Sequence, residues 1–207
     1  MGISSDIACI FGSAGFAKEV WAVCKRLKIP IPYFIDKHNE GNLVCSTPII
    51  SDDDFDPKKY RAIVAIGDPK IRRKLCNFVK HKGGKFRTIV DPSAILLNPS
   101  RIEISEGCVI CAGVVITIDV FLGKHCHVNL NSTIGHDTQI GDYVTISPGV
   151  NISGNVKIGK NCYIGTSASI KEHINICDDT TIGMGSIVVK NIEDPGIYIG
   201  IPARRIK

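Results

Sequence analysis

The sequence predicts a chain in two parts: an α/β unit with a βαβαβ order, followed by an all-β parallel helix built from hexapeptide repeats. Two observations lead to this prediction. The second half places an aliphatic residue at every sixth position over a long stretch, and the first half alternates short apolar runs with glycine turns and amphipathic segments. We place the boundary after residue 90, which gives an α/β part of residues 1–90 and a β-helix part of residues 91–207.

The hexapeptide repeat runs from Ile104 to Val188 without interruption. An α-helix repeats every ~3.6 residues and a strand every ~2, so neither accounts for a period of six. A parallel β-helix does, because each hexad forms one flat side of a triangular prism and three hexads close one coil. The aliphatic positions, which we expect to fill the prism interior, are Ile104, Ile110, Ile116, Leu122, Val128, Ile134, Ile140, Ile146, Ile152, Ile158, Ile164, Ile170, Ile176, Ile182 and Val188.

A small or β-branched residue follows each aliphatic position four residues later, where we expect the chain to turn a corner. Glycine directly follows several of the aliphatic residues and relieves the turn. Where a small position is cysteine, we expect a buried thiol that behaves as a small hydrophobic group. The small positions are Cys108, Val114, Val120, Cys126, Ser132, Thr138, Val144, Val150, Val156, Cys162, Ala168, Ile174, Thr180 and Ser186.

The α/β part opens with a predicted strand at residues 6–11, a glycine turn and a predicted helix at residues 16–27. A helix N-terminus that follows such a turn can receive an anion, because its first backbone N–H groups point outward. The pattern is G-x-x-G, shorter than the dinucleotide fingerprint, and also fits a tight turn between strand and helix. The turn consists of Gly12, Ser13, Ala14 and Gly15.

Two further predicted strands end in residues that suit a nucleotide. The strand at residues 31–35 ends at Asp36, where an acid often reaches a ribose hydroxyl, and the strand at residues 60–66 ends at Gly67 and Asp68. A basic amphipathic helix follows at residues 71–80, and a linker containing Pro92 is expected at residues 88–94. The carboxyl ends of parallel strands meet at one edge of a sheet, so we expect a mononucleotide site there.

Composition limits the classes of partner. The net charge of +5 and the pI near 8.7 suit anionic small ligands. Nucleic-acid binding is not indicated, because the sequence contains no basic run interleaved with aromatic residues. We see no targeting peptide and no apolar span long enough to cross a membrane, so we expect a cytoplasmic protein without membrane insertion. The Cys108–Cys111 and His125–His127 pairs each lack the second half of a zinc motif, so we expect no metal.

The candidate catalytic residues are His136 and Asp137. His136 stands two positions after the inward Ile134, so its side chain should point away from the core. An imidazole beside a carboxylate suits removal of a proton from an attacking amine or hydroxyl group. The alternative is an ordinary solvated histidine, which the acidic neighbour and the surrounding polar residues argue against.

The chain resembles the two-domain hexapeptide-repeat sugar acetyltransferases. These enzymes act on nucleotide-linked amino sugars of the bacillosamine, perosamine and viosamine type or on sialic acid. The resemblance extends over essentially the whole sequence. The matching segments are residues 11–16 (FGSAGF), 65–68 (AIGD) with 71–72 (IR), 134–137 (IGHD), 154–162 (GNVKIGKNC) and 200–205 (GIPARR).

This resemblance implies a left-handed β-helix that assembles as a homotrimer, with acetyl-CoA in the groove between neighbouring subunits. His136 is then the general base, Asp137 its orienting acid, and the backbone N–H of Gly154 a donor to the acetyl carbonyl. The residues implied to bind acetyl-CoA are Thr145, Gly154, Thr166, Met184, Lys190, Pro202, Arg204 and Arg205. Those implied to bind the nucleotide sugar are Gly12, Ser13, Ala14, Gly15, Asp36, Lys37, Gly67, Asp68 and Asn129.

One departure from the family leaves the acceptor open. Many sugar N-acetyltransferases of this family carry a second histidine nine residues after the catalytic one, where this chain has Thr145. Our leading hypothesis is N-acetylation at C4 of a nucleotide-linked deoxyamino sugar by direct attack on the thioester. The alternative is O-acetylation of sialic acid or a related sugar acid.

A third hypothesis is that the chain is not an acetyltransferase but a metal-dependent hydratase or a purely structural prism. The histidines that the chain offers for a hydratase are His125, His127 and His136. A hydratase needs these three side chains to converge. His136 is paired with an acid, and the other two belong to a different side of the coil, which argues against this interpretation.

Overall fold

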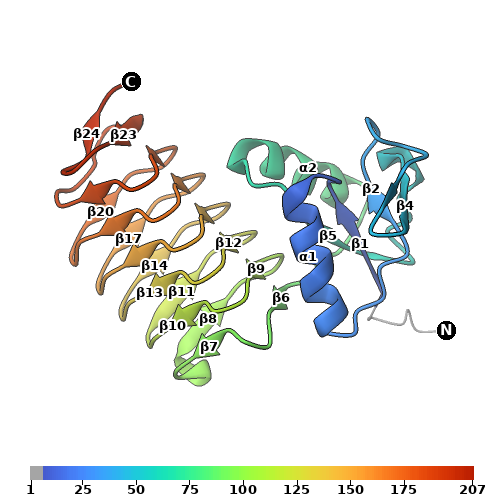
Figure 1. Ribbon diagram of the computed structural model, residues 1–207, viewed down its shortest axis with the longest axis horizontal. Helices are drawn as coiled ribbons and strands as arrows, with labels where there is room; N and C mark the ends of the chain where they lie inside the picture. The colour runs from blue at the N-terminus through green and yellow to red at the C-terminus, as the bar shows by residue number, and fades with distance from the viewer. Residues whose placement is uncertain (1–6) are drawn as a thin grey trace. The chain divides into compact units, whose positions relative to one another are not determined.

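The computed structural model describes residues 7–207, and it divides into two compact units between Ile89 and Val90 (Figure 1). The first unit is an α/β layer structure and the second is a coiled run of short parallel strands. Neither helix in residues 7–207 has the length and apolar character that crossing a bilayer requires.

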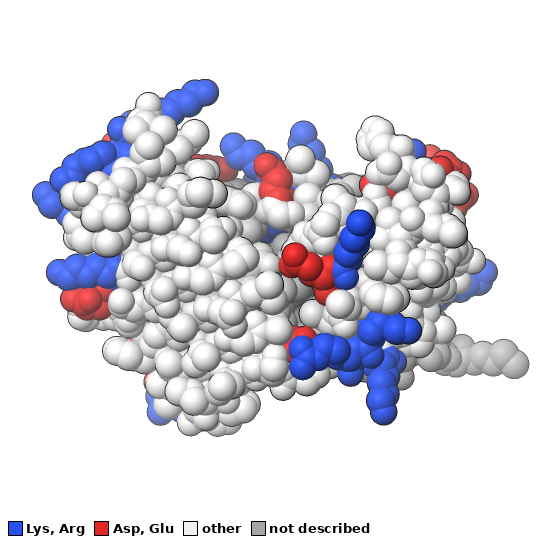
Figure 2. Space-filling model, in the orientation of Figure 1, with Lys and Arg blue, Asp and Glu red and all other residues white. Residues whose placement is uncertain are grey.

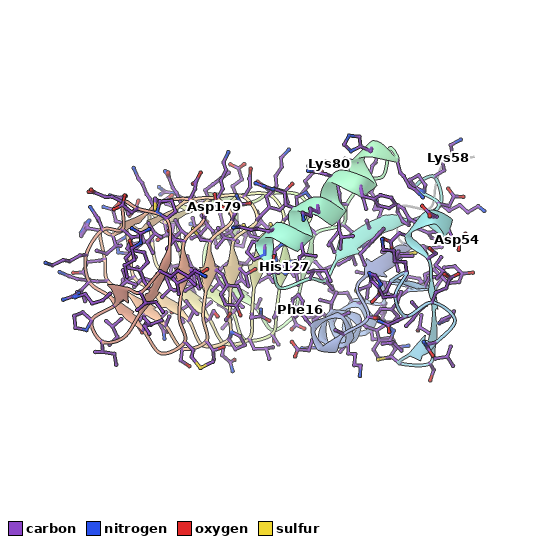
Figure 3. All side chains as sticks on the ribbon, turned by 90° about the horizontal axis from the view of Figure 1, so that it is seen from above. Phe16, Asp54, Lys58, Lys80, His127 and Asp179 are labelled. Carbon is purple, nitrogen blue, oxygen red and sulfur yellow. The ribbon has the colours of Figure 1, made fainter. Side chains whose placement is uncertain are left out.

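The first unit is a five-stranded sheet in the order β3-β4-β2-β1-β5, accompanied by two helices. Four strands are parallel, whereas β3 pairs with β4 in antiparallel fashion. Phe16 lies on α1 and Lys80 on α2 (Figure 3). The elements are β1 (Ala8–Phe11), α1 (Gly15–Arg26), β2 (Phe34–Ile35), β3 (Leu43–Val44), β4 (Thr47–Ile50), the 3₁₀ helix η1 (Asp52–Asp54), β5 (Arg61–Val64) and α2 (Pro69–His81).

The predicted helices and three predicted strands are present, although Asp6, the expected start of the first strand, lies outside the described residues. The connection from β2 to β5 differs from a βαβαβ unit, because it consists of the β3–β4 hairpin and η1 rather than an α-helix. The hairpin is difficult to recognise in the sequence. Its strands are short, Pro48 interrupts the pattern, and its turn at Cys45 and Ser46 uses the left-handed conformation without a glycine.

The second unit has three flat faces, each a parallel sheet whose strands follow one another at intervals of one coil. We name them after one strand each. The β10 face holds β7 (Ile95–Leu96), β10 (Val115–Ile116), β13 (Thr133–Ile134), β16 (Asn151–Ile152), β19 (Ser169–Ile170) and β22 (Ile187–Val188). The β11 face holds β8 (Ile102–Ile104), β11 (Val120–Leu122), β14 (Gln139–Ile140), β17 (Lys157–Ile158) and β20 (Asn175–Ile176).

The β12 face is the longest and includes the C-terminal hairpin of β23 and β24. His127, labelled in Figure 3, lies on it. Its strands are β6 (Ile89–Val90), β9 (Val109–Ile110), β12 (His127–Val128), β15 (Thr145–Ile146), β18 (Tyr163–Ile164), β21 (Thr181–Ile182), β23 (Ile197–Ile199) and β24 (Arg204–Arg205). The register offset of eighteen residues, as between Val115 and Thr133, confirms three hexads per coil.

The core confirms the predicted repeat. All aliphatic positions from Ile110 to Val188 are at most 3% exposed, and the small corner positions are at most 5% exposed. Several small polar residues donate a hydrogen bond to the carbonyl fifteen residues later: Cys108 Sγ to Gly123 O at 3.1 Å, and Ser132 Oγ to Ser147 O at 2.9 Å. Such donors fit at a crowded corner and satisfy a buried carbonyl there, which explains why polar atoms are tolerated inside the prism.

The linker expected at residues 88–94 is instead part of the first coil. The Asp91 N–H donates to Ile110 O at 2.9 Å, and Ile95 N–H donates to Val114 O at 2.8 Å. The segment around Pro92 is a tight turn, in which the Asp91 carboxylate accepts from both the backbone N–H and the hydroxyl of Ser93. The sequence hides this coil because Asn98 occupies the next expected aliphatic position.

The core of the prism should respond sharply to loss of volume. We expect Ile140→Ala to lower the free energy of unfolding by about 2–5 kcal/mol, because it removes a fully buried side chain from between two coils. The neighbouring Gln139→Ala, on the exposed side of the same strand, should change it by less than about 0.5 kcal/mol. Urea unfolding of both variants at one protein concentration checks this, and equal effects would contradict the assigned register.

Candidate functional site

His136 lies on the corner between the β10 and β11 faces, which we call the His136 corner (residues 135–138 and their equivalents in the other coils). The turn links β13 to β14, and Asp137 within it has a φ of 57°. This left-handed residue reverses the chain within four positions and leaves both side chains outside the prism. The side chains of His136 and Asp137 are 65% and 59% exposed.

The two side chains form a hydrogen-bonded pair. His136 Nδ1 lies 2.7 Å from Asp137 Oδ2. When Nδ1 carries the proton and donates to the carboxylate, Nε2 presents a lone pair and can act as a base. The carboxylate also stabilises the imidazolium that forms once Nε2 accepts a proton. The arrangement can therefore remove a proton from a nucleophile held beside Nε2.

Gly154 lies next to this imidazole on the following coil. The Asn155 N–H donates to His136 O at 2.7 Å, which fixes the two coils against each other. A Cβ placed on Gly154 would collide with Nε2, Cε1 and Cδ2 of His136. The missing side chain thus lets the ring lie directly over the backbone, with its reactive nitrogen beside the Gly154 main chain.

The other predicted acetyl-CoA residues fall on three parts of the prism. Lys190 is exposed on the His136 corner, three coils beyond His136. Thr166 and Met184 lie on the corner between the β12 and β10 faces, which we call the Asn129 corner after Asn129, one of its residues (129–132 and their equivalents). The third part is the exposed C-terminal hairpin with Pro202, Arg204 and Arg205.

Thr145, also among the predicted acetyl-CoA residues, is buried. It lies on β15 of the β12 face and is only 2% exposed. Its hydroxyl therefore offers little surface to a ligand in this conformation of the chain. Asn129 is also largely buried, at 7% exposed, and its side-chain carbonyl lies 3.7 Å from Cys111 Sγ.

In the first unit, the turn after β1 is tightly packed. Gly12 has a φ of 104°, and a Cβ there would come 2.7 Å from the side chain of Ile66. The loop after β1 therefore lies against the loop after β5. Helix α1 starts at Gly15, and the preceding Ala14 supplies no side-chain cap to its first N–H groups. These N–H groups can receive a phosphate.

Asp36 anchors a small polar cluster at the end of β2. Its carboxylate accepts hydrogen bonds from the Ser13 hydroxyl, from Asn39 Nδ2 at 3.0 Å and from the His38 N–H at 3.1 Å. Burial acts to raise the pKa of Asp36, but these hydrogen bonds outweigh it and hold the pKa below its ordinary value. Asp36 is thus a preformed anionic acceptor. The adjacent Lys37 is exposed, and its N–H donates to Asp52 Oδ1 at 3.3 Å.

Asp68 has a structural use that the sequence did not reveal. Its Oδ1 caps α2 by accepting from the N–H groups of Lys70 and Ile71, both at 2.8 Å. Arg72, which is fully buried, donates through Nη1 to Ile66 O at 2.7 Å and to Gly67 O at 3.1 Å. Arg72 lies four and seven residues before the buried Cys76 and Val79, a helical spacing that puts all three on the inner face of α2. This spacing could have identified Arg72 as a buried residue from the sequence.

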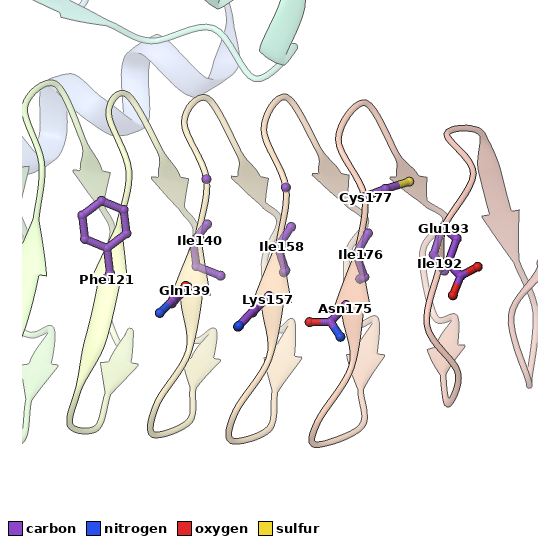
Figure 4. A pocket seen from close by; sticks show the side chains of 12 residues that line it. Phe121, Gln139, Ile140, Lys157, Ile158, Asn175, Ile176, Cys177, Ile192 and Glu193 are labelled. Atoms are coloured by element: carbon purple, nitrogen blue, oxygen red, sulfur yellow. The ribbon is translucent and has the colours of Figure 1, made fainter.

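The described residues hold no metal cluster, and a groove lies away from His136. Among residues 7–207, no group of three or more His, Cys, Asp or Glu side chains is placed to hold a metal ion. An open groove of about 530 Å³ runs along the β11 face, lined by Phe121, Gln139, Lys157 and Asn175 among others (Figure 4). Its lining does not include His136 or Asp137, so it is separate from that pair.

Comparisons with known proteins match both units. The family described as the PglD N-terminal domain matches residues 8–79, and the family described as the hexapeptide repeat of succinyl-transferase matches residues 102–117 and 155–190. A GDP-perosamine N-acetyltransferase of Escherichia coli O157:H7 is 34% identical over 90 residues. That stretch covers 44% of this chain and 39% of the relative.

Solved structures match over almost the whole chain. The acetyltransferase domain of PglB from Neisseria gonorrhoeae FA1090, in complex with acetyl coenzyme A, is 28% identical with a TM-score of 0.91, covering 98% of this chain and 100% of that one. A variant of perosamine N-acetyltransferase from Caulobacter crescentus, in complex with CoA and GDP-perosamine, is 26% identical with a TM-score of 0.92, covering 100% of both chains.

The close approach at Gly154 gives a structural prediction. We expect Gly154→Ala to rotate the His136 ring away from its present position, since the added methyl group needs the same space. A crystal structure of the variant checks this, with Ser153→Ala as the control because that neighbouring side chain is exposed. An unmoved ring in Gly154→Ala would contradict the described packing.

These matches confirm the resemblance inferred from the sequence: the chain shares both units, in the same order, with two-domain hexapeptide-repeat sugar N-acetyltransferases.

Proposed function

We propose that this protein transfers an acetyl group from acetyl-CoA to the C4 amino group of a nucleotide-linked deoxyamino sugar, in the cytoplasm. The observation that carries the proposal is the His136–Asp137 pair, whose Nε2 lies beside the main chain of Gly154 on the next coil. The relatives support the choice of substrates, because one was solved with acetyl coenzyme A and another with CoA and GDP-perosamine.

The chemistry follows from the pair. The sugar nitrogen attacks the thioester carbonyl while Nε2 of His136 takes a proton from it, and Asp137 stabilises the resulting imidazolium. The C–S bond then breaks, and the leaving thiolate takes up the proton. In this proposal the Gly154 N–H donates to the carbonyl oxygen of the thioester, which becomes negatively charged before the C–S bond breaks.

We assign no covalent acyl-enzyme intermediate to this reaction. The cysteines at the corner positions of the β-helix, Cys108, Cys126 and Cys162, are fully buried in the prism core. Burial also raises the pKa of the Cys162 thiol to about 12, so it stays protonated near neutral pH and is a poor nucleophile. Direct attack by the amine within a ternary complex is consistent with these observations.

The nucleotide part of the substrate belongs to the first unit in this proposal. The open N-terminus of α1 would receive the diphosphate, and the Asp36 carboxylate would accept from a ribose hydroxyl. Asp68 would act indirectly, since its carboxylate is engaged in capping α2.

A homotrimer completes the proposed site, and the distribution of charge supports it. The β10 face presents Ile95, Val115, Thr133, Asn151, Ser169 and Ile187 on its outer side. Residues 108–117, 144–156, 162–170 and 180–189 contain no Lys, Arg, Asp or Glu. Over the β-helix, Figure 2 likewise shows a broad area with few charged side chains.

Exposed apolar side chains border this uncharged face, among them Leu97 (63% exposed), Leu130 (37%) and Met184 (78%). An uncharged, partly apolar surface suits contact with another copy of the chain. The two long edges of the β10 face are the Asn129 corner and the His136 corner. If three copies pack their β10 faces around an axis, each His136 corner meets the Asn129 corner of the next copy.

Such packing would gather the scattered cofactor residues into one groove. His136, Gly154 and Lys190 would come from one copy, and Thr166 and Met184 from its neighbour. The relatives from Escherichia coli O157:H7 and Caulobacter crescentus favour N-acetyl transfer over O-acetylation, because both are named N-acetyltransferases.

The reaction itself is the direct test. We would incubate the protein with acetyl-CoA and UDP-, dTDP- or GDP-linked 4-amino sugars, with free sialic acid in parallel, and follow thiol release and product mass. Acetylation of an amino sugar nucleotide supports the proposal. Acetylation of sialic acid alone, or none across the panel, contradicts it.

Removal of the general base should be costly. We expect His136→Ala to lower kcat about 10²–10⁴-fold, the usual range for a general base, without changing the assembly mass or the Kd for acetyl-CoA. His81→Ala, an exposed histidine on α2, serves as the control. Turnover near wild type in His136→Ala would remove His136 from the mechanism.

Asp36 should contribute to the affinity for the nucleotide but not to the affinity for acetyl-CoA. Because its pKa is lowered, the Asp36 carboxylate is ionised at neutral pH, and its contribution to nucleotide binding should persist as the pH falls toward the ordinary carboxyl range. We expect Asp36→Asn to weaken binding of the preferred nucleoside diphosphate about tenfold while leaving the acetyl-CoA Kd unchanged. Calorimetry checks this, with the exposed Asp54→Asn as control; equal losses in both variants would contradict the assignment.

A further inference from the structure

The His136 corner carries a column of left-handed residues, one from each of four consecutive coils. Asp119, Asp137, Asn155 and His173 have φ values of 57°, 57°, 58° and 60°. The same backbone conformation repeats at each level, so the side chains leave the corner in similar directions. Neighbouring levels are about 4.8 Å apart, the usual spacing of hydrogen-bonded strands.

This column puts a second carboxylate next to the catalytic pair. Asp119 lies one coil before Asp137, and the Asp137 N–H donates to Ile118 O at 3.2 Å, which holds the two levels together. Two like charges at such a separation raise each other's energy. An unpaired Asp119 would also add to the negative field at the His136 imidazole.

Arg101 removes that problem. It is the last residue of the 3₁₀ helix η2 (Pro99–Arg101), and two of its guanidinium nitrogens donate to the two carboxylate oxygens of Asp119. Arg101 Nε lies 2.6 Å from Asp119 Oδ1, and Nη2 lies 2.7 Å from Oδ2. This fork-to-fork geometry is the strongest and most directional form of an arginine–carboxylate pair. Lys cannot reproduce it.

Other charges near the corner are also paired or more distant along the column. Lys171 Nζ lies 3.8 Å from Glu172 Oε1, and Asn155 Nδ2 lies 2.8 Å from His173 Nδ1. Lys190 lies one coil beyond Glu172 on the same corner. On the adjoining β11 face, the charged outward positions are Glu103 and Lys157.

We propose that Arg101 is a positioning residue for the reaction: by holding and neutralising Asp119, it leaves Asp137 as the one carboxylate whose charge acts on His136. The proposal rests on the proposed function of His136 as a base. Without Arg101, the free Asp119 carboxylate would favour the imidazolium, and a smaller fraction of His136 would be available as a base at neutral pH.

The expected effect is modest but measurable. A unit charge on a neighbouring coil of a solvated surface shifts the titration midpoint of a nearby group by about half a pH unit. Added salt should reduce the effect, because Asp119 is 33% exposed and its field is screened.

A variant cycle read by NMR tests this without relying on activity. The full-length protein, labelled with ¹³C in its histidine rings, is titrated as wild type, Arg101→Met, Asp119→Asn and the double variant; the signal missing from His136→Gln identifies His136. We expect its midpoint to move up by about half a unit in Arg101→Met, to move slightly down in Asp119→Asn, and to return to within about 0.2 unit of wild type in the double variant.

The direction of the midpoint shift in each single variant, and its reversal in the double variant, distinguish an electrostatic role of Arg101 from a structural one. If Arg101 only braces the turn, the double variant stays as perturbed as Arg101→Met, and the proposal fails. An unshifted midpoint in Arg101→Met also overturns it. If acetyl transfer is observed, the acid limb of the pH profile of kcat/KM should shift together with the NMR midpoint. If the protein has no such activity, the proposed function is wrong, but the NMR titration still tests the effect of Arg101 on His136.

Discussion

Closure of each coil in eighteen residues is the constraint on which the rest of the β-helix depends. Parallel strands of two residues are stable here because every coil repeats the one before it and pairs with it at the same register. An aliphatic side chain must then enter the prism every sixth residue, and a small one must follow at each corner. This requirement leaves the outward residues and the corner turns available for chemistry.

The proposed catalytic pair, His136 and Asp137, depends on the geometry of the corner. A left-handed residue at Asp137 turns the chain, the turn exposes His136, and a glycine on the next coil gives the ring room. The stacking of coils also brings charged residues close together, because the backbone positions of equivalent residues on neighbouring coils are only about 5 Å apart. The Arg101–Asp119 pair is our interpretation of how the chain manages that proximity.

The sequence predicted the β-helix well because its period is unusual and each repeat obeys the same packing rule. It missed the first coil, where Asn98 breaks the period, and the β3–β4 hairpin, whose short strands and glycine-free turn give no clear pattern. Site residues were harder. His136 and Asp137 are adjacent in sequence and could be paired directly, whereas the burial of Thr145 and the capping role of Asp68 depend on neighbours that only the folded chain supplies.

A structure of the protein bound to acetyl-CoA tests the central claim most directly: that the two edges of the β10 face form one site between copies. The account predicts a threefold assembly with the acetyl thioester beside Nε2 of His136, between the His136 corner of one copy and the Asn129 corner of the next. Acetyl-CoA bound within a single copy, or along the groove of the β11 face away from His136, would contradict it.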